Sequence, residues 1–518
     1  MRAKTRWSAS RAAPPLKYMS TEQGKTESAG FLANFRNWTS LTGLLVMAAS
    51  VFAFVLLLFI DALSHFSNPY LGILSYLVAP AFLFFGLFLL LLGAVLRRRR
   101  MGKARGMTLT VRIDLSRARD RRILMMFVFS SVAFLLITAL GSYHTYHYTE
   151  SVQFCGLACH SVMKPEYVTY SHSPHAKVAC AECHIGAGAT WYVRSKLSGT
   201  YQVYATMADK YPRPIPTPVK NLRPAQETCE ECQWPKKFVG NLDRTYNYYL
   251  QDATNTPYSI RLALKVGGGD PTHGPVGGIH WHMNVGNKIE YVASDEARQT
   301  IPWVRMTDAQ GAVTVFKSAS FTNDINALNV RTMDCVDCHN RPAHSFASPE
   351  NAVDLAITLN HIDRSLPYVK TNAIDVLIKP YTTETEALQN IATTLKARYA
   401  TNDQAAVTGT IAALQQIYQD NFFPEMKSSW KVYPNNIGHK DWPGCFRCHD
   451  GKHTTGDGKR TIKANDCNAC HTILAQGSGA KLEQLSALGQ KFAHPGDPDI
   501  YDPAFQCTDC HQEKAGKP

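Results

Sequence analysis

All 14 cysteines of the 518-residue chain fall into seven pairs, and six of these pairs are followed directly by a histidine. A C-x-x-C-H run is typical of covalent haem attachment, because the two thiols bond the porphyrin and the adjacent imidazole binds the iron. Five pairs have this spacing, the first has one extra residue between its cysteines, and the third ends in Gln233. The pairs with the residues that follow them are Cys155/Cys159 with His160, Cys180/Cys183 with His184, Cys229/Cys232 with Gln233, Cys335/Cys338 with His339, Cys445/Cys448 with His449, Cys467/Cys470 with His471, and Cys507/Cys510 with His511. The sequence therefore predicts a multihaem c-type cytochrome.

Zinc and disulfides explain the cysteines less well. Structural zinc needs four ligands at each site and does not require a histidine directly after the second cysteine. Disulfide frameworks are typical of short secreted domains, whereas this chain is long enough to bury ordinary cores. The predicted cofactor is haem c, in seven copies, or in six if the Gln233 motif carries none. That motif could also take a histidine from elsewhere or leave a weak or vacant axial position, because an amide is a poor iron ligand.

An iron in an electron carrier usually takes a second axial ligand. Thirteen histidines lie outside the motifs. Among them, His280 and His282 flank Trp281 and in a strand would share one face. Met163, three residues after His160, is either a soft axial ligand or a packing residue. The predicted distal ligands are His175, His280, His282, His344, His439, His453 and His494.

Three apolar stretches precede the haem motifs. Leu41 to Ile60, Leu71 to Leu96 and Ile123 to Gly141 contain no charged residue over 20, 26 and 19 positions. Each is long enough to cross a hydrocarbon layer about 30 Å thick. We therefore expect three transmembrane helices in a lipid bilayer, with a kink in the second at Pro80.

The distribution of charge predicts the orientation of this anchor. Residues 1–122 hold 18 Lys/Arg and 5 Asp/Glu, whereas the remaining residues hold 36 of each. By the positive-inside rule, the N-terminal tail and the basic loop 97–122 are cytoplasmic. Topology accounts for this basic charge, so no nucleic-acid partner is expected. The haem domain then lies outside the bacterial inner (cytoplasmic) membrane, in the periplasm, where haem is attached covalently.

The expected fold is a mainly α multihaem cytochrome, with three N-terminal transmembrane helices and an external haem domain with little regular structure and a small β-containing insert. Strands are predicted at Ser259–Val266, Lys288–Ala293 and Ala312–Lys317. Helices are predicted near Glu350–Leu359, Glu384–Tyr399 and Asp403–Asp420. The predicted regions are a cytoplasmic basic tail (1–40), the three-helix anchor (41–142), a module with motifs one to three (143–240), a β-like insert that could supply haem ligands (241–325), and a C-terminal four-haem module (326–518).

The stretch from Phe154 to Gly240 resembles the NapC/NirT/NrfH family of membrane-anchored multihaem cytochromes. The whole chain is more similar to the seven-haem ImcH-type inner-membrane cytochromes of metal-reducing bacteria. The segments that carry the resemblance are Phe154 to Pro165, Ser173-Pro174-His175, Cys180 to Gly186, Pro214 to Val219, Cys229 to Phe238, Cys335 to Phe346, and Tyr433 to His453. The resemblance covers most of residues 125–518 and is weak in the β-like insert.

The resemblance implies a quinol dehydrogenase that oxidises menaquinol or ubiquinol beside the first haem. Electrons would then pass to periplasmic multihaem cytochromes or a reductase, in respiration or extracellular electron transfer. The family's quinol-site lysine matches Lys196. The family's acidic residue has no clean match, and Asp209 is the nearest acid beyond that place. A homo- or hetero-oligomer is compatible with this expectation.

Two other functions remain open. A terminal reductase would use an open haem near Gln233 to reduce nitrite, hydroxylamine or a sulfur oxyanion. A relay subunit would pass electrons without a quinone site of its own, so substitution of Lys196 would leave it unaffected.

Overall fold

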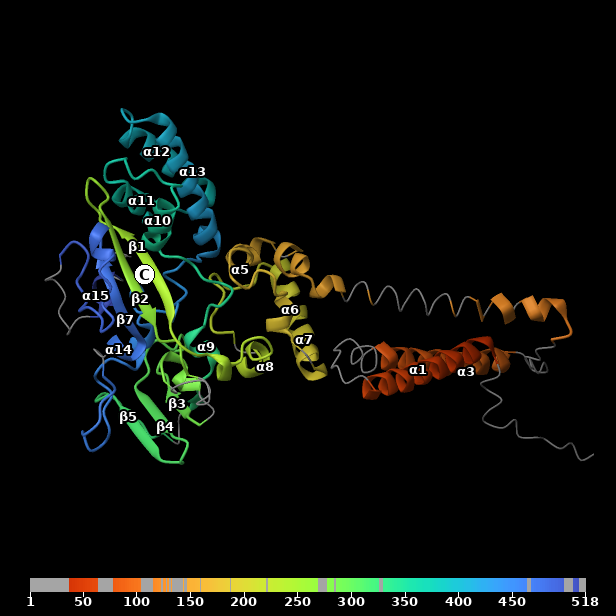
Figure 1. Ribbon diagram of the computed structural model, residues 1–518. Helices are drawn as coiled ribbons and strands as arrows, with labels where there is room; N and C mark the ends of the chain where they lie inside the picture. The colour runs from red at the N-terminus through yellow and green to blue at the C-terminus, as the bar shows by residue number, and fades with distance from the viewer. Residues whose placement is uncertain are drawn as a thin grey trace, which may run out of the picture. The chain divides into compact units, whose positions relative to one another are not determined.

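The chain forms two compact units, Met1–Ala133 and Phe134–Pro518. In the computed structural model, shown in Figure 1, the described residues are 37–63, 78–103, 115–122, 124–126, 128–129, 132, 143, 147–158, 160–186, 188–219, 222–268, 277–283, 286–325, 329–463, 467–497 and 506–511.

Two long apolar helices dominate the first unit. They are α1 (Trp38–Leu63) and α3 (Ala79–Lys103), and both are long and apolar enough to cross a membrane. They coincide with the first two predicted spans, whereas most of the third, Ile123 to Gly141, lies outside the described residues. Pro80 stands in the first turn of α3, where its missing N–H is not needed for the helix. Residues 71–77, which precede it in the predicted span, lie outside the described ones, so the kink predicted at Pro80 stays a prediction.

Glycines allow α1 and α3 to approach closely. A Cβ atom on Gly43 would lie 2.5 Å from the carbonyl oxygen of Gly86, and one on Gly86 would lie 2.7 Å from Cγ of Met47. The hydroxyl of Ser40 adds an interhelical hydrogen bond to the carbonyl of Leu90 at 3.0 Å. Small residues and hydroxyl bonds are what hold helices together where apolar burial gives no advantage over lipid. The pair is thus built as a membrane anchor.

Short helical turns carry the cysteine motifs in the second unit. A single turn brings the two cysteines of a motif and the next residue to one side of the chain, as a thioether-bound porphyrin requires. These and the neighbouring helices are η3 (Phe154–Ala158), α5 (His160–Ser171), α6 (Cys180–His184), α7 (Ala189–Met207), α8 (Ala225–Cys229), α9 (Cys335–Cys338), η9 (Gly444–Arg447), α14 (Cys467–Cys470) and α15 (Cys507–His511). Further 3-10 turns are η4 (Pro235–Lys237), η6 (Ile279–Met283), η8 (Pro424–Met426) and η10 (Gly479–Leu482).

Two antiparallel sheets lie between the motifs. The first has the order β1-β2-β7 and the second β5-β4-β3-β6, and the three strands of the first run side by side in Figure 1. The strands are β1 (Leu242–Tyr249), β2 (Pro257–Leu264), β3 (Lys288–Val292), β4 (Trp303–Thr307), β5 (Val313–Lys317), β6 (Arg331–Thr332) and β7 (His471–Gly477). The three predicted strands are confirmed as β2, β3 and β5. Because β7 follows the sixth motif, the predicted insert shares a sheet with the C-terminal module.

Four helices without any cysteine motif enclose the largest apolar core. They are α10 (Pro349–Thr358), α11 (Val369–Ile378), α12 (Glu384–Arg398) and α13 (Gln404–Asn421), grouped together in Figure 1. Thr383 caps α12 by accepting from the N–H of Glu386, and Asp403 caps α13 by accepting from the N–H of Ala405. The three predicted helices are confirmed, and α11 is an additional one. The described chain therefore mixes helices and strands more evenly than the predicted mainly α fold.

Candidate haem-binding sites

Five motif histidines each face a second histidine from elsewhere in the chain. An iron bound about 2 Å from each of two imidazole nitrogens holds the ring centroids roughly 6 Å apart. The facing rings, with their centroid separations, are His184 and His344 (6.2 Å), His339 and His280 (6.2 Å), His449 and His282 (5.9 Å), His471 and His439 (6.2 Å), and His511 and His494 (6.3 Å). All five pairs thus have the spacing that an iron with two axial imidazoles requires.

Hydrogen bonds orient the rings of the distal histidines. Nδ1 of His280 donates to the carbonyl of Val266 at 3.0 Å, and Nδ1 of His344 donates to the carbonyl of Glu166 at 2.9 Å. The ring of His282 makes the same bond within η6, to the carbonyl of Ile279, at 2.8 Å. A carbonyl can only accept, so Nδ1 carries the proton and Nε2 presents its lone pair. This is the tautomer that binds iron through Nε2.

Burial favours the neutral form of six of the facing imidazoles. It lowers the pKa of His184 to about 4, with a smaller contribution from the facing His344. Burial is likewise the main cause that lowers the pKa of the other five affected rings, which are His280, His339, His439, His449 and His471. Neutral imidazole is the form that ligates metals, so these rings need no deprotonation before they bind iron.

The first four motifs follow one another in space. The thiol of Cys155 is hydrogen-bonded to that of Cys180, and the thiol of Cys229 to that of Cys335. Cys232 of the third motif lies close enough to Cys183 of the second to raise the pKa of its thiol, although burial and other neighbours raise it more. Motif one therefore neighbours motif two, motif two neighbours motif three, and motif three neighbours motif four.

The succession continues to the last motif. The single turn η6 supplies His280, which faces motif four, and His282, which faces motif five. His439 stacks on Phe446 of motif five at 4.5 Å while it faces the sixth motif. Its Nδ1 lies 3.6 Å from Sγ of Cys507 in motif seven. Motifs one to five thus follow one another in the order of the sequence, and His439 lies against motifs five, six and seven.

Three of the predicted attachment cysteines are exposed, whereas the others that the structure describes are half-buried. The exposed ones are Cys232, Cys445 and Cys510, each a free thiol. On α15, Cys507 is half-buried and Cys510 is not, so protein contacts partly enclose only one thiol of the seventh motif. Exposure is compatible with a thioether, because the thiol must be open to the incoming porphyrin. None of the described residues encloses Cys510, and its role in haem attachment, like that of the other motif cysteines, stays a prediction from spacing.

A buried carboxylate fixes the fourth motif. Asp337 is 2% exposed and accepts from the hydroxyl of Tyr291 at 2.6 Å, and from Arg298 and Arg331 at 3.0 Å each. Asp334 caps the same turn, and its own N–H donates to Asp337 at 2.9 Å. These bonds hold the α9 turn, and with it the direction of His339, against the β3–β6 strand pair.

His453 does not face a motif histidine. Its Nδ1 lies 2.7 Å from a carboxylate oxygen of Asp450, and its Nε2 lies 2.6 Å from the carbonyl of Ile301. Both partners can only accept, so both nitrogens carry protons and the ring is an imidazolium. These hydrogen bonds outweigh burial and raise the pKa of His453. A ring with no free lone pair cannot bind iron, so His453 leaves the predicted ligand set.

The shared face suggested for His280 and His282 depended on a strand at this place. They lie in the 3-10 turn η6 rather than in a strand, and they face two different motifs instead of sharing one face. Gly268 allows this, because a Cβ there would lie 2.6 Å from Cβ of His280. The pattern of alternating residues is the same for a short turn and a strand, so the sequence alone did not distinguish them.

The remaining predicted ligands have less structural context. His175 donates from Nδ1 to the carbonyl of Pro342 at 3.0 Å and neighbours His339, but no second imidazole faces it among the described residues. Gln233 is exposed at the end of the third motif. Met163 lies on α5, one turn after His160. The side chains of Cys159, His160 and Cys467 lie outside those described.

Lys196 on α7 pairs with an acid that the sequence did not indicate. Its Nζ is hydrogen-bonded to a carboxylate oxygen of Glu150, lies 3.4 Å from Oγ1 of Thr149, and sits over the ring of Tyr192 at 5.1 Å. Burial, with help from Glu150, raises the pKa of Tyr192 to about 12. The pair also lies beside Cys155. Cys180 and burial are the main causes that raise the pKa of the Cys155 thiol; Glu150 raises it further, and Lys196 lowers it. Lysine and carboxylate thus adjoin the first motif.

Asp209 is not part of this group. It follows the end of α7, about three turns beyond Lys196, and pairs with Arg213 at 2.6 Å. Its side chain is 69% exposed. The acid beside Lys196 is therefore Glu150, which precedes the first motif and was not visible from any spacing along α7.

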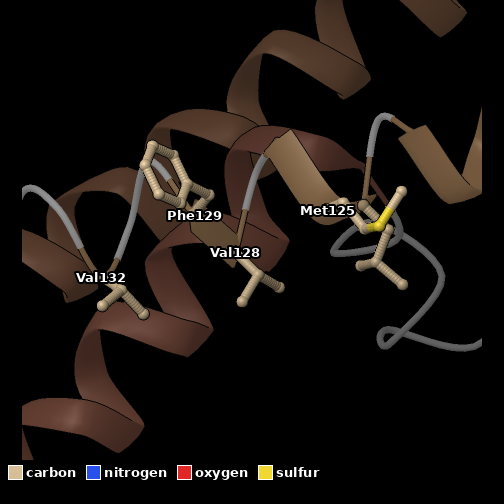
Figure 2. A pocket seen from close by; sticks show the side chains of 5 residues that line it. Met125, Val128, Phe129 and Val132 are labelled. Atoms are coloured by element: carbon tan, nitrogen blue, oxygen red, sulfur yellow. The ribbon is translucent and has the colours of Figure 1, made fainter.

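An apolar hollow in the first unit offers no comparable chemistry. It measures about 410 Å³ and is lined by five side chains, four of which Figure 2 labels. These five are Leu124, Met125, Val128, Phe129 and Val132. Exposures such as 76% for Phe129 fit contact with lipid, and no lining group can take or give a proton.

Comparison with known proteins identifies the family of this chain. The profile of the NapC/NirT cytochrome c family, N-terminal region, matches residues 117–233. The cytochrome c-type protein ImcH of Geobacter sulfurreducens is 39% identical over 503 residues, which cover 94% of this chain and 97% of ImcH. The chain belongs to the ImcH-type cytochromes. It is thus a membrane-associated multihaem c-type cytochrome of electron transport.

A second relative is similar over a much smaller part of the chain. The cytochrome c-type protein NrfH of Wolinella succinogenes is 26% identical over 126 residues, covering 23% of this chain and 71% of NrfH. No solved structure matches the chain. The ImcH-type resemblance therefore covers nearly the whole chain, whereas the NrfH resemblance covers less than a quarter of it.

Proposed function

We propose that this chain oxidises menaquinol at the bacterial inner membrane and passes the electrons through its c-type haems to periplasmic acceptors. The observation that carries the proposal is the Lys196–Glu150 pair beside Cys155, at the start of a continuous series of motifs. A proton-handling group at one end of a series of redox sites is what quinol oxidation requires.

We assign the iron ligands from the facing rings. Haem c supplies one-electron redox chemistry when it is bound. The proposed axial pairs are His184/His344, His339/His280, His449/His282, His471/His439 and His511/His494. For the first motif we keep the prediction of His160, with Met163 as its candidate partner.

Glu150 and Lys196 divide the work of deprotonating the quinol. Quinol loses two protons with its two electrons, so a base must stand at its hydroxyl. The Glu150 carboxylate, whose side chain is 11% exposed, can accept such a proton. The Lys196 ammonium can donate a hydrogen bond to the oxygen that becomes negative. A pair that is partly shielded from water makes both interactions stronger than they are in solvent.

The outer face of α7 suits a membrane surface. Val193, Leu197 and Tyr201 follow one another at intervals of four residues and are 46%, 69% and 66% exposed. An apolar stripe beside the Lys196 pair would contact lipid and the isoprenoid tail of a quinol. Together with the positive-inside distribution of charge, this supports a cytoplasmic N-terminus and a periplasmic haem domain.

Reduction by quinol in liposomes tests the proposal. The protein is reconstituted, a reduced menaquinol analogue is added, and haem absorbance is followed. Lys196→Gln and Glu150→Gln are each expected to slow quinol-driven reduction about 10²-fold or more, the usual effect of losing an acid–base group. Dithionite should still reduce every variant fully. Asp209→Asn is the matched control and should retain the wild-type rate.

Two outcomes would overturn it. If quinol does not reduce haems that dithionite can reduce, the protein is not a quinol dehydrogenase. If quinol reduces them but neither substitution slows the reaction, quinol binds elsewhere and Lys196 is a surface residue.

One observation favours a second activity at the third motif. Gln233 is exposed, and His175, unlike His453, has an oriented ring with only one nitrogen hydrogen-bonded and no facing imidazole among the described residues. We propose that His175 ligates the third haem and that Gln233 leaves its other axial position weak. Such a position would bind nitrite or hydroxylamine, as a terminal reductase requires.

Gln233→His is expected to close that position. The wild-type protein should show one high-spin haem that binds cyanide, measured by electron paramagnetic resonance and optical titration. The variant should lose this signal because imidazole is a strong-field axial ligand. An unchanged spectrum on adding cyanide to the wild type would exclude the reductase activity.

A further inference from the structure

One buried arginine has half of its hydrogen-bonding capacity unused. The Arg341 side chain is 8% exposed, and its guanidinium lies over the ring of Tyr433 at 3.9 Å. Nη1 lies 3.6 Å from Oε1 of Glu166. Nε and Nη2 are buried and have no partner among the described residues.

A buried guanidinium with unpaired donors lowers the stability of the folded protein unless a ligand pairs with them. A guanidinium stays charged in proteins, and a buried charged donor without an acceptor destabilises the folded state. The two unused donor atoms, Nε and Nη2, therefore indicate that an acceptor pairs with them when the protein carries its cofactors.

The unused donors form one edge of the guanidinium. Nε–H and Nη2–H run parallel, and this fork matches the two oxygens of a carboxylate. The opposite side, with Nη1, is the one turned to Glu166. The acceptor is thus expected to be a planar carboxylate that arrives from outside the described protein atoms.

The location of Arg341 identifies the source of that carboxylate. Arg341 follows His339 by two residues, and Oε2 of Glu166 lies 3.2 Å from Nδ1 of His344. The rings of His344 and His184 face each other at 6.2 Å. Arg341 therefore adjoins the second haem site through a carboxylate that also touches its distal ligand.

We propose that Arg341 binds a propionate carboxylate of the haem held by His184 and His344, through its Nε–Nη2 edge. The inference rests on the ligand assignment made under the proposed function. The guanidinium places one positive charge beside this haem and holds its propionate in a fixed position. Arg341 is a positioning residue, and it stabilises the reduced state because ferrous haem carries one positive charge less than ferric haem.

Arg341→Met and Arg341→Lys in the full-length holoprotein test the inference, with Arg398→Met as the control. Arg398 is an exposed arginine of α12 that pairs with Asp375 at 3.2 Å. Haem content is measured first, as the pyridine haemochrome. Redox titration and the propionate bands of the resonance Raman spectrum follow.

In Arg341→Met, haem content is expected to stay at the wild-type level because thioethers hold the porphyrin. At a fixed potential, the ratio of reduced to oxidised haem at one site should fall at least tenfold, about 59 mV for a one-electron couple. Arg341→Lys keeps the charge but not the fork, so it should retain most of the potential and still alter the propionate bands. Arg398→Met should change neither.

Unchanged potentials and propionate bands in a fully haemylated Arg341→Met would overturn the inference and leave the proposed function intact. Wild-type haem potentials that vary with added acetate would also overturn the inference, since the Nε–Nη2 edge of Arg341 would then be open to a free carboxylate. Low haem content in the wild type would instead contradict haem attachment by the motif cysteines, on which the proposed function also rests. If Arg341→Met does not accumulate, the propionate bands of Arg341→Lys decide the question.

Discussion

His282→Ala is expected to convert one haem from six-coordinate low-spin to five-coordinate high-spin, whereas His453→Ala should leave all haems unchanged. Both histidines were predicted ligands from their places in the sequence. In the structure, His282 faces His449 at 5.9 Å with its Nε2 free, whereas both ring nitrogens of His453 are taken by Asp450 and Ile301. The spin state is read from electron paramagnetic resonance and from the optical spectrum with and without cyanide.

The comparison within this pair decides the assignment. Haem content should match the wild type in both variants, because the thioether cysteines are retained. His453→Ala should reduce stability instead, since it leaves the Asp450 carboxylate without its charged partner. A new high-spin signal in His453→Ala, or none in His282→Ala, would contradict the proposed ligand pairs.

Lys370→Met is expected to destabilise the four-helix region by about 3–5 kcal/mol, the usual cost of removing one partner of a buried ion pair. Nζ of Lys370 lies 2.7 Å from a carboxylate oxygen of Asp354 and 2.6 Å from the carbonyl of Tyr249. The two side chains are 6% and 4% exposed, so the remaining carboxylate would stay buried without a counterion. The urea-induced loss of helical circular dichroism measures the effect.

The double variant Lys370→Met/Asp354→Leu is the control for this prediction. Removing both charges replaces an ion pair by apolar contact, which is often neutral in free energy. Most of the lost stability should therefore return. If the double variant is as unstable as Lys370→Met, the loss comes from packing rather than from the unpaired charge.

Local patterns predicted the elements that have a clear period. Lys288–Ala293 alternates polar and apolar residues and forms β3, although the strand is buried on both faces after Lys288. Glu384–Tyr399 begins after Thr383, a good N-cap, and forms α12. β7 was missed because it begins at His471, inside a motif whose cysteines and histidine hid the strand pattern. α11 was missed because Tyr368, in the left-handed conformation, gives no capping signal at its start.

The motif residues could be assigned from spacing alone, whereas their partners could not. A covalent attachment signature is local, but a distal ligand depends on which loop folds back to the iron. This is why His344 and His453 looked alike in the sequence and differ in the structure. Glu150 was invisible for the same reason, since it precedes the first motif while Lys196 follows the second. Proximity between such segments is a property of the fold.

The facing histidine pairs also set an order of maturation. With the proposed ligands, each iron closes a loop of chain, and closing a loop costs more entropy as the loop lengthens. His494 and His511 close the shortest loop, so the last site can complete its ligation as soon as it leaves the membrane. His184 must wait for His344, and His282 for His449, each far downstream. During export, the early haem sites would thus remain open on one side until most of the chain has been delivered, and their protection would depend on uninterrupted secretion.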